Sequence, residues 1–140
     1  MTQTLVVDAS VALKWVLPED DSGLAERLLD RKGWLHAPAF IFMEMANALW
    51  YQMRAGKLSA ADAAGCMADL RQAPLVIWDG EEPLPSTLEW ARTLDHAVYD
   101  CAYLALALHL DGAYITADQR FWRKAQRPEL NHRVLGLAEL

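Results

Sequence analysis

Four acidic residues with the chemistry of a metal site are spread along this chain: Asp8, Glu44, Asp100 and Asp118. Carboxylates gathered in one place repel one another unless a cation lies between them. Ligands of this kind favour Mg²⁺ or Mn²⁺, and such an ion can activate a water and stabilise charge on a phosphate. The set therefore indicates metal-dependent hydrolysis of a phosphodiester.

Each acid also has a purely structural explanation. Asp8 follows an apolar run, as Asp does in many α/β proteins, and Glu44 fits the solvated start of a helix, where the helix dipole favours it. Asp100 and Asp118 are both suitable as helix N-caps. These alternatives stay open for each residue taken singly, and only the set of four favours a cation.

Polar neighbours extend the candidate site. Ser10 and Thr116 are near enough in sequence to Asp8 and Asp118 to orient a ligand or a water. Asn47 lies at i+3 from Glu44, on the same helical face. Lys14 has two open explanations: it reaches a phosphate or a neighbouring carboxylate, or it belongs to a solvated face.

Short apolar runs alternate with helical segments along the whole chain. Strands are predicted at 5–7, 34–37, 75–78, 113–115 and 134–137, and helices at 11–17, 22–31, 40–55, 59–71, 85–94, 99–110 and 118–125. Ser10 and Ser59 are the expected N-caps of two of these helices. The helix at 40–55 is apolar nearly all round, which predicts burial on both sides.

The strands lack a clean alternation of apolar and polar residues. This favours a parallel sheet covered by helices on both faces, a three-layer α/β/α sandwich. Ligands of such sheets bind at the carboxyl ends of the strands. Asp8 follows one strand and Asp118 closely follows another, so we expect both at the same edge.

Composition restricts the function further. The chain has 140 residues, 54% of them hydrophobic, and a net charge of −6, which predicts one globular domain over 1–140 and argues against a non-specific DNA coat. Cys66 and Cys101 have no CxxC spacing, so neither a disulfide framework nor a zinc site is expected. No signal peptide or bilayer-spanning segment is recognisable, which predicts a cytoplasmic protein without a membrane partner.

Four stretches resemble the PIN-domain ribonucleases, and within them the VapC toxins of bacterial toxin–antitoxin pairs. They are VVDASVALKW (6–15), PAFIFMEMANALW (38–50), YDCAYLALA (99–107) and TADQRF (116–121). Each is modest alone, but their order along nearly the whole chain is specific. One departure is Cys101, where the family commonly has a small apolar residue, and we expect it to pack as a small hydrophobe.

The resemblance implies an α/β/α PIN fold and an endoribonuclease that needs Mg²⁺ or Mn²⁺. It implies a homodimer and a VapB-type antitoxin that covers the site. It places Asp8, Glu44, Asp100 and Asp118 on the family's acidic positions, as catalytic residues and metal ligands. Ser10, Asn47 and Thr116 fall on its supporting polar positions. Candidate contacts to RNA phosphates are Arg120, Arg123 and Lys124.

Three other classes fit less well. A haloacid-dehalogenase-type phosphatase needs a second acid two residues after Asp8, where this chain has Ser10. A response-regulator receiver needs an acidic pair near the first strand and a Lys near the last strand, and both are missing. A catalytically inactive PIN fold serving as a binding module is disfavoured because all four acids are present.

Histidines and tryptophans receive mainly structural interpretations. His96 lies four residues before Asp100 and could approach the site, but a structural or surface role is favoured over it. Most tryptophans are predicted to be core rather than base-stacking platforms. Trp15 and Trp50 are hypothesised to build a dimer surface or the antitoxin groove.

Overall fold

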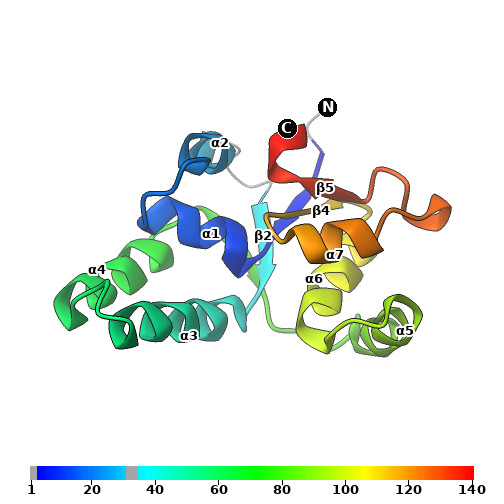
Figure 1. Ribbon diagram of the computed structural model, residues 1–140. Coiled ribbons are helices and arrows are strands. Elements are labelled where there is room, and N and C mark those ends of the chain that lie inside the picture. The colour runs from blue at the N-terminus through cyan, green and yellow to red at the C-terminus, as the bar shows by residue number, and fades with distance from the viewer. Residues whose placement is uncertain (1–2, 31–34) are drawn as a thin grey trace.

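A parallel sheet forms the centre of the protein (Figure 1). The computed structural model describes residues 3–30 and 35–140. Its five strands run in the order β3-β2-β1-β4-β5, and every pairing is parallel. Their bounds are β1 Leu5–Val7, β2 Leu35–Pro38, β3 Leu75–Trp78, β4 Ala113–Thr116 and β5 Val134–Gly136. The predicted strands are confirmed to within a residue or two, and Trp34 lies outside the described residues.

Helices connect the strands and cover the sheet. They are α1 Ala9–Val16, α2 Ser22–Arg27, α3 Ile41–Arg54, α4 Ala60–Arg71, α5 Leu84–Leu94, α6 Val98–His109 and α7 Gln119–Lys124. The described residues also contain the short 3₁₀ turns η1 Leu28–Asp30, η2 Pro128–Leu130 and η3 Leu137–Glu139. The helix predicted at 22–31 is thus α2 followed by η1, and its predicted end at residue 31 lies outside the described residues. No helix in the described ranges has the length and apolar character needed to cross a bilayer.

Alternate residues of the strands build two separate cores, which confirms the α/β/α sandwich. Leu5 and Ile115 face one side, where α1, α2, η1 and η3 pack on them. Val6 and Tyr114 face the other side, against α6, α7 and the start of α3. In the view of Figure 1, α1 to α4 lie to the left of β2, and α5, α6 and α7 lie to its right. Helix α6 crosses the middle of the sheet and contacts β1, β2 and β4, as its apolar sequence predicts.

Two expectations about burial are wrong. Helix α3 buries only one face, because Met43 and Tyr51 are 74% and 58% exposed. The edge strand β3 is not covered on both faces either, since Val76 and Ile77 are 39% and 38% exposed. Apolar composition alone did not reveal which of these residues the rest of the fold leaves uncovered.

The expected N-caps are half right. Ser59 caps α4 by accepting a hydrogen bond from the Asp62 backbone N–H. The cap of α1 is Asp8 and not Ser10, because the chain turns into the helix one residue after β1 ends. Ser10 lies in the first turn and donates its hydroxyl hydrogen to Asp8.

Lys14 is buried between α1 and the turn that leads to α2. Its ammonium group lies 2.6 Å from Glu19 and 2.8 Å from Asp21, in the turn between α1 and α2. Burial alone would lower the pKa of Lys14, but the hydrogen bonds to Asp21 and Glu19 outweigh burial and raise it. Lys14 therefore fixes α2 against α1. It reaches neighbouring carboxylates, as one of its two explanations held, but these carboxylates are not among the four acids, and Lys14 does not lie on a solvated face.

Glycine at position 112 allows β4 to lie close to β1. A Cβ at this position would lie 2.3 Å from the backbone carbonyl oxygen of Thr4. That oxygen also accepts the Ala113 N–H at the start of the β1–β4 pairing. A larger residue must therefore push apart the two strands that carry Asp8 and Thr116.

We expect Gly112→Ala to lower the free energy of unfolding by about 1–3 kcal/mol, the usual cost of overpacking. Chemical denaturation followed by circular dichroism measures it. Gly65→Ala is the matched control, because a Cβ there meets nothing within 4 Å and Gly65 lies inside α4. The control should be neutral or stabilising by up to about 1 kcal/mol; equal effects of the two changes would contradict the close approach.

Candidate active site

Asp8 is the most constrained acid of the protein. It is 3% exposed, and four donors converge on its carboxylate. Oδ2 accepts hydrogen bonds from the hydroxyls of Tyr114 and Thr116. Oδ1 accepts from the Ser10 hydroxyl and, at 3.1 Å, from the Val11 backbone N–H. The donors come from α1 and β4, so the carboxylate is held in one orientation at the carboxyl edge of the sheet.

Burial has a measurable consequence for this acid. It raises the pKa of Asp8 above its ordinary value, although the hydrogen bonds from Ser10, Tyr114 and Thr116 act to lower it. Removal from water disfavours a charge more strongly than these neutral donors favour it. The charged form that can bind a cation therefore carries a cost in the free protein.

Glu44 lies in the first turn of α3, with its carboxylate half-buried. Its Oε1 accepts a hydrogen bond of 2.6 Å from the Tyr103 hydroxyl, on α6. Burial raises the pKa of Glu44; the Tyr103 hydrogen bond opposes the rise, and the charges of Asp100 and Asp8 add to it. The helix-start explanation for Glu44 thus holds for its position but not for its surroundings.

Two stacked tyrosines connect Glu44 to Asp8. The rings of Tyr103 and Tyr114 lie 5.6 Å apart at an angle of 14°. One hydroxyl donates to Glu44 and the other to Asp8. Burial and the neighbouring carboxylates raise the pKa of both phenols, so both remain protonated donors. The phenols were not identified as part of the site from the sequence.

Asp100 and Asp118 form the more open half of the cluster. Asp118 caps α7: its Oδ1 accepts from the backbone N–H groups of Arg120 and Phe121. Asp100 lies in the first turn of α6, where Ala97 holds the cap position, and its Oδ2 lies 2.6 Å from His96 Nε2. One potential ligand atom from each of His96, Asp100 and Asp118 lies within 4.8 Å of the others.

The supporting residues divide into two groups. Ser10 and Thr116 connect Asp8 to the loop before α7, because Ser10 Oγ accepts the Ala117 N–H and Thr116 Oγ1 accepts the Asp118 N–H. Asn47 is exposed and shares a cavity of about 600 Å³ with Glu44. In the described part of the chain no hydrogen bond joins Asn47 to Glu44.

Three hollows lie in this region of the protein, and acids of the cluster line two of them. The cavity beside Glu44 is bounded by Phe40, Met43 and Tyr99. A second, of about 450 Å³, is lined by His96, Asp100 and Asp118, with Arg120 and Lys124 at its side.

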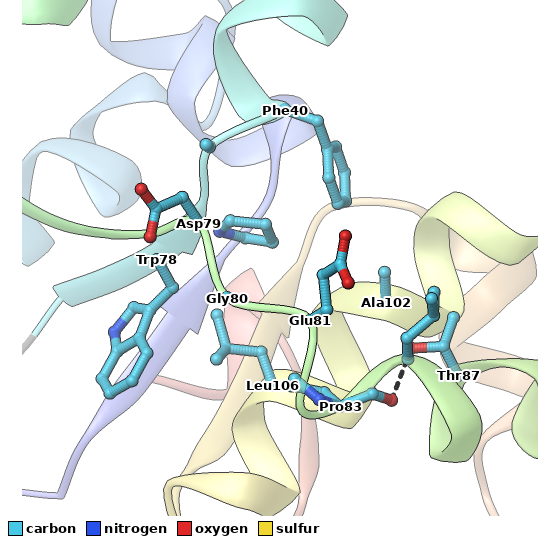
Figure 2. A pocket seen from close by; sticks show the side chains of 12 residues that line it. Phe40, Trp78, Asp79, Gly80, Glu81, Pro83, Thr87, Ala102 and Leu106 are labelled. Atoms are coloured by element: carbon cyan, nitrogen blue, oxygen red, sulfur yellow. Dashed lines mark hydrogen bonds between the residues drawn. The ribbon is translucent and has the colours of Figure 1, made fainter.

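The third hollow, of about 310 Å³, lies between the ends of β2 and β3 and helices α5 and α6, and none of the four acids lines it (Figure 2). Its walls are mainly apolar. In Figure 2 the Glu81 side chain extends toward Phe40, while Thr87 closes the far wall through its hydrogen bond to the Pro83 carbonyl. This pocket is therefore a neighbour of the acid cluster rather than part of it.

The comparison with known families agrees with this geometry. The family model described as PIN domain matches residues 5–127. The chain belongs to the PIN-domain family. Within the family its relatives are VapC proteins: it is 33% identical to Ribonuclease VapC3 of Pyrobaculum aerophilum, over 86% of this chain and 93% of the relative. It is 31% identical to Ribonuclease VapC9 of Mycobacterium tuberculosis, over 83% of this chain and 87% of the relative.

Solved structures share the PIN fold at low sequence identity. PAE2754 from Pyrobaculum aerophilum superposes with a TM-score of 0.75 at 18% identity, over 99% of this chain and 93% of that one. VapC20 of Mycobacterium tuberculosis, described as a toxin that cleaves the sarcin-ricin loop, gives 0.64 at 16% identity, over 84% and 92%. VapBC2 from Rickettsia felis, bound to a promoter DNA fragment, gives 0.65 at 13% identity, over 95% and 98%.

The raised pKa values predict how stability depends on pH. An acid whose pKa is higher in the folded than in the unfolded protein costs stability once it ionises. Stability of the metal-free protein should therefore fall as pH rises above the ordinary values of 3.8 for Asp and 4.5 for Glu. Glu44→Gln removes one such charge and keeps an oxygen that can accept from Tyr103.

We expect Glu44→Gln to raise the melting temperature by about 3 °C near pH 7 and to leave it unchanged near pH 4. Thermal unfolding at both pH values measures this. Glu129→Gln is the control, because Glu129 is exposed and its pKa is lowered instead. A Glu44→Gln protein that is less stable than the wild type at pH 7 would contradict the conclusion that the charge of Glu44 destabilises the metal-free protein.

Proposed function

We propose that this PIN-domain protein is a metal-dependent endoribonuclease and the toxin of a VapBC-type toxin–antitoxin pair. One observation carries the proposal: carboxylates from four separate segments lie at one sheet edge. The charges of Asp100 and Asp8 raise the pKa of Glu44, and a ligand atom of Asp118 lies within 4.8 Å of one of Asp100. Within the described residues, no Lys or Arg forms an ion pair with any of the four. A cation is the partner that such a cluster lacks.

The donor set fits a hard divalent cation. Carboxylate and hydroxyl oxygens are the ligands that Mg²⁺ and Mn²⁺ prefer, and several water ligands usually remain. We assign Asp8, Glu44 and Asp100 as the residues that hold the ion, with Asp118 holding a water or a second ion. When bound, the ion would supply an activated water and stabilise negative charge on the phosphate.

The chain itself contributes rigidity and orientation. Asp8 cannot rotate without breaking hydrogen bonds to α1 and β4. Tyr103 holds Glu44 in the same way from α6. Preorganised charges of this kind need no rearrangement when the phosphate arrives, which is the main route by which a protein accelerates such a reaction.

Charge indicates where an RNA strand would lie. Arg120 and Lys124 border the cavity that contains Asp100 and Asp118, and both offer positive charge to a phosphate. The pocket of Figure 2 is lined instead by Asp79 and Glu81, which repel phosphates. We infer that the RNA backbone crosses the α6–α7 side of the acid cluster. Arg123 is exposed on the same helix, α7, and is a further candidate contact.

Partners follow from family membership and from the exposed surface. The Rickettsia felis VapBC2 structure pairs such a chain with its antitoxin, and we propose a VapB-type antitoxin here, with both proteins in the cytoplasm, where RNA is the substrate. We also propose a homodimer through the uncovered face of α3. Trp50 is 46% exposed on that face, whereas Trp15 donates its indole N–H to Ala25 within its own chain.

Replacement of the central acid tests the enzyme. We expect Asp8→Asn to lower RNA cleavage by purified, antitoxin-free protein more than about 100-fold, beyond the loss typical for residues that only support a metal ligand. A fluorescent RNA substrate with Mg²⁺ or Mn²⁺ measures the rate, and expression of the variant should no longer arrest growth. Because Asp8 has four donors, Glu44→Gln is made in parallel as a variant expected to stay folded.

The matched control is Asp69→Asn, since Asp69 is exposed on α4, away from the acid cluster. It should cleave RNA at the wild-type rate. If folded Asp8→Asn and Glu44→Gln proteins both retained full activity, the site assignment would fail. A wild-type protein that cleaves no RNA but binds the antitoxin would instead be an inactive binding module.

The dimer has its own test. We expect Trp50→Glu to reduce the mass measured by light scattering from that of a dimer to that of the 15.7 kDa monomer, because a charge cannot be buried in an apolar interface without a partner. Leu140→Glu is the control, at an exposed apolar residue at the C-terminal end, which Figure 1 shows well away from α3. An unchanged dimer mass for Trp50→Glu would count against this interface.

A further inference from the structure

His96 lies at the edge of the acid cluster, between α5 and α6. Its Nε2 is 2.6 Å from Asp100 Oδ2, and its side chain is only 8% exposed. It also lines the cavity that contains Asp118. A buried imidazole directed at one oxygen of one carboxylate is placed to control how that carboxylate points.

Several contacts fix the imidazole in place. Asp95 has a left-handed backbone with φ of 50°, which turns the chain at the end of α5. The His96 backbone N–H then donates to the Ala91 carbonyl. Its ring packs edge-to-face on Phe121 with centroids 5.0 Å apart. His96 thus belongs to the rigid frame made by α5, α6 and α7.

Asp100, by contrast, has little else to orient it. It lies in the first turn of α6 and does not hold the cap position of that helix. The hydrogen bond from His96 occupies Oδ2 and leaves Oδ1 for another partner. Without the imidazole, the carboxylate would be free to rotate about its side-chain bonds toward solvent.

We propose that His96 is a positioning residue that orients Asp100 for cation binding. The proposal rests on the proposed metal site, and it adds a residue outside the four acids. Carboxylates that bind metals are commonly held by an outer hydrogen bond, and losing that bond costs about 10–100-fold in metal affinity. His96 acts through Asp100 and does not bind the ion itself, because a nitrogen that carries the donated proton has no lone pair for a metal.

Metal affinity without RNA tests the proposal. Isothermal titration with Mn²⁺ compares the wild type with His96→Ala and His96→Gln. We expect His96→Ala to weaken Mn²⁺ binding about 10–100-fold. His96→Gln, whose side-chain amide can donate to the same oxygen, should recover most of the loss. His109→Gln is the control, because His109 is exposed at the other end of α6 and should change nothing.

A double-mutant cycle separates positioning from general loss of structure. If His96 acts through Asp100, His96→Ala should have no further effect on Mn²⁺ affinity once Asp100→Asn is present. Additive losses would overturn the proposal, and so would wild-type affinity in His96→Ala. Should His96→Ala fail to fold, the wild type labelled with ¹⁵N-histidine gives the answer. Nε2 should stay protonated when Mg²⁺ is added, and loss of that proton would show direct ligation instead.

Failure of this proposal is distinguishable from failure of the proposed function. A wild-type protein that binds neither Mn²⁺ nor Mg²⁺ overturns both. A wild-type protein that binds Mn²⁺ and cleaves RNA, with His96→Ala unaffected in Mn²⁺ affinity, overturns only the role of His96.

Discussion

The buried carboxylate of Asp8 is the constraint on which the rest of the structure depends. Asp8 directly follows β1, caps α1 and accepts hydroxyl hydrogens from β4, so one residue joins three elements. A carboxylate removed from water in this way is tolerated only with several donors around it. Because the donors lie in α1 and β4, they hold the Asp8 carboxylate in a fixed position relative to the sheet. The position of the site therefore depends on the position of these elements.

The sequence predicted the architecture well, because the architecture follows from patterns of single residues. It also singled out four acids, which the fold brings to one edge of the sheet. Short apolar runs indicated the strands. The positions of Asp8 and Asp118 after two of these strands indicated that both lie at the same edge of the sheet. The exposed faces of α3 and β3 were missed because burial depends on which elements pack nearby, which no local pattern encodes. The sequence left the partners of Lys14 open for the same reason: Glu19 and Asp21 approach it only when α2 folds back on α1.

The two phenols that the sequence did not indicate, Tyr103 and Tyr114, both act across the fold. Tyr103 reaches Glu44 over 59 residues of sequence and Tyr114 reaches Asp8 over 106, so no short motif contains either pair. His96 is different, because it lies four residues before Asp100 and one helical turn separates them. That spacing indicates that His96 can contact Asp100. It does not indicate the left-handed turn at Asp95, which directs the imidazole toward the site.

The site combines a rigid half with an open half. Asp8 and Glu44 each accept a hydrogen bond from a phenol, and the raised pKa values of the two phenols keep the phenols protonated. Burial removes both acids partly or wholly from water. Asp100 and Asp118 border an open cavity with Arg120 and Lys124 beside it. A protein of net charge −6 has little general attraction for RNA. In the proposed function, affinity for RNA would come from the open half, where a cation and two basic side chains can contact one phosphate, while the rigid half would hold the ion.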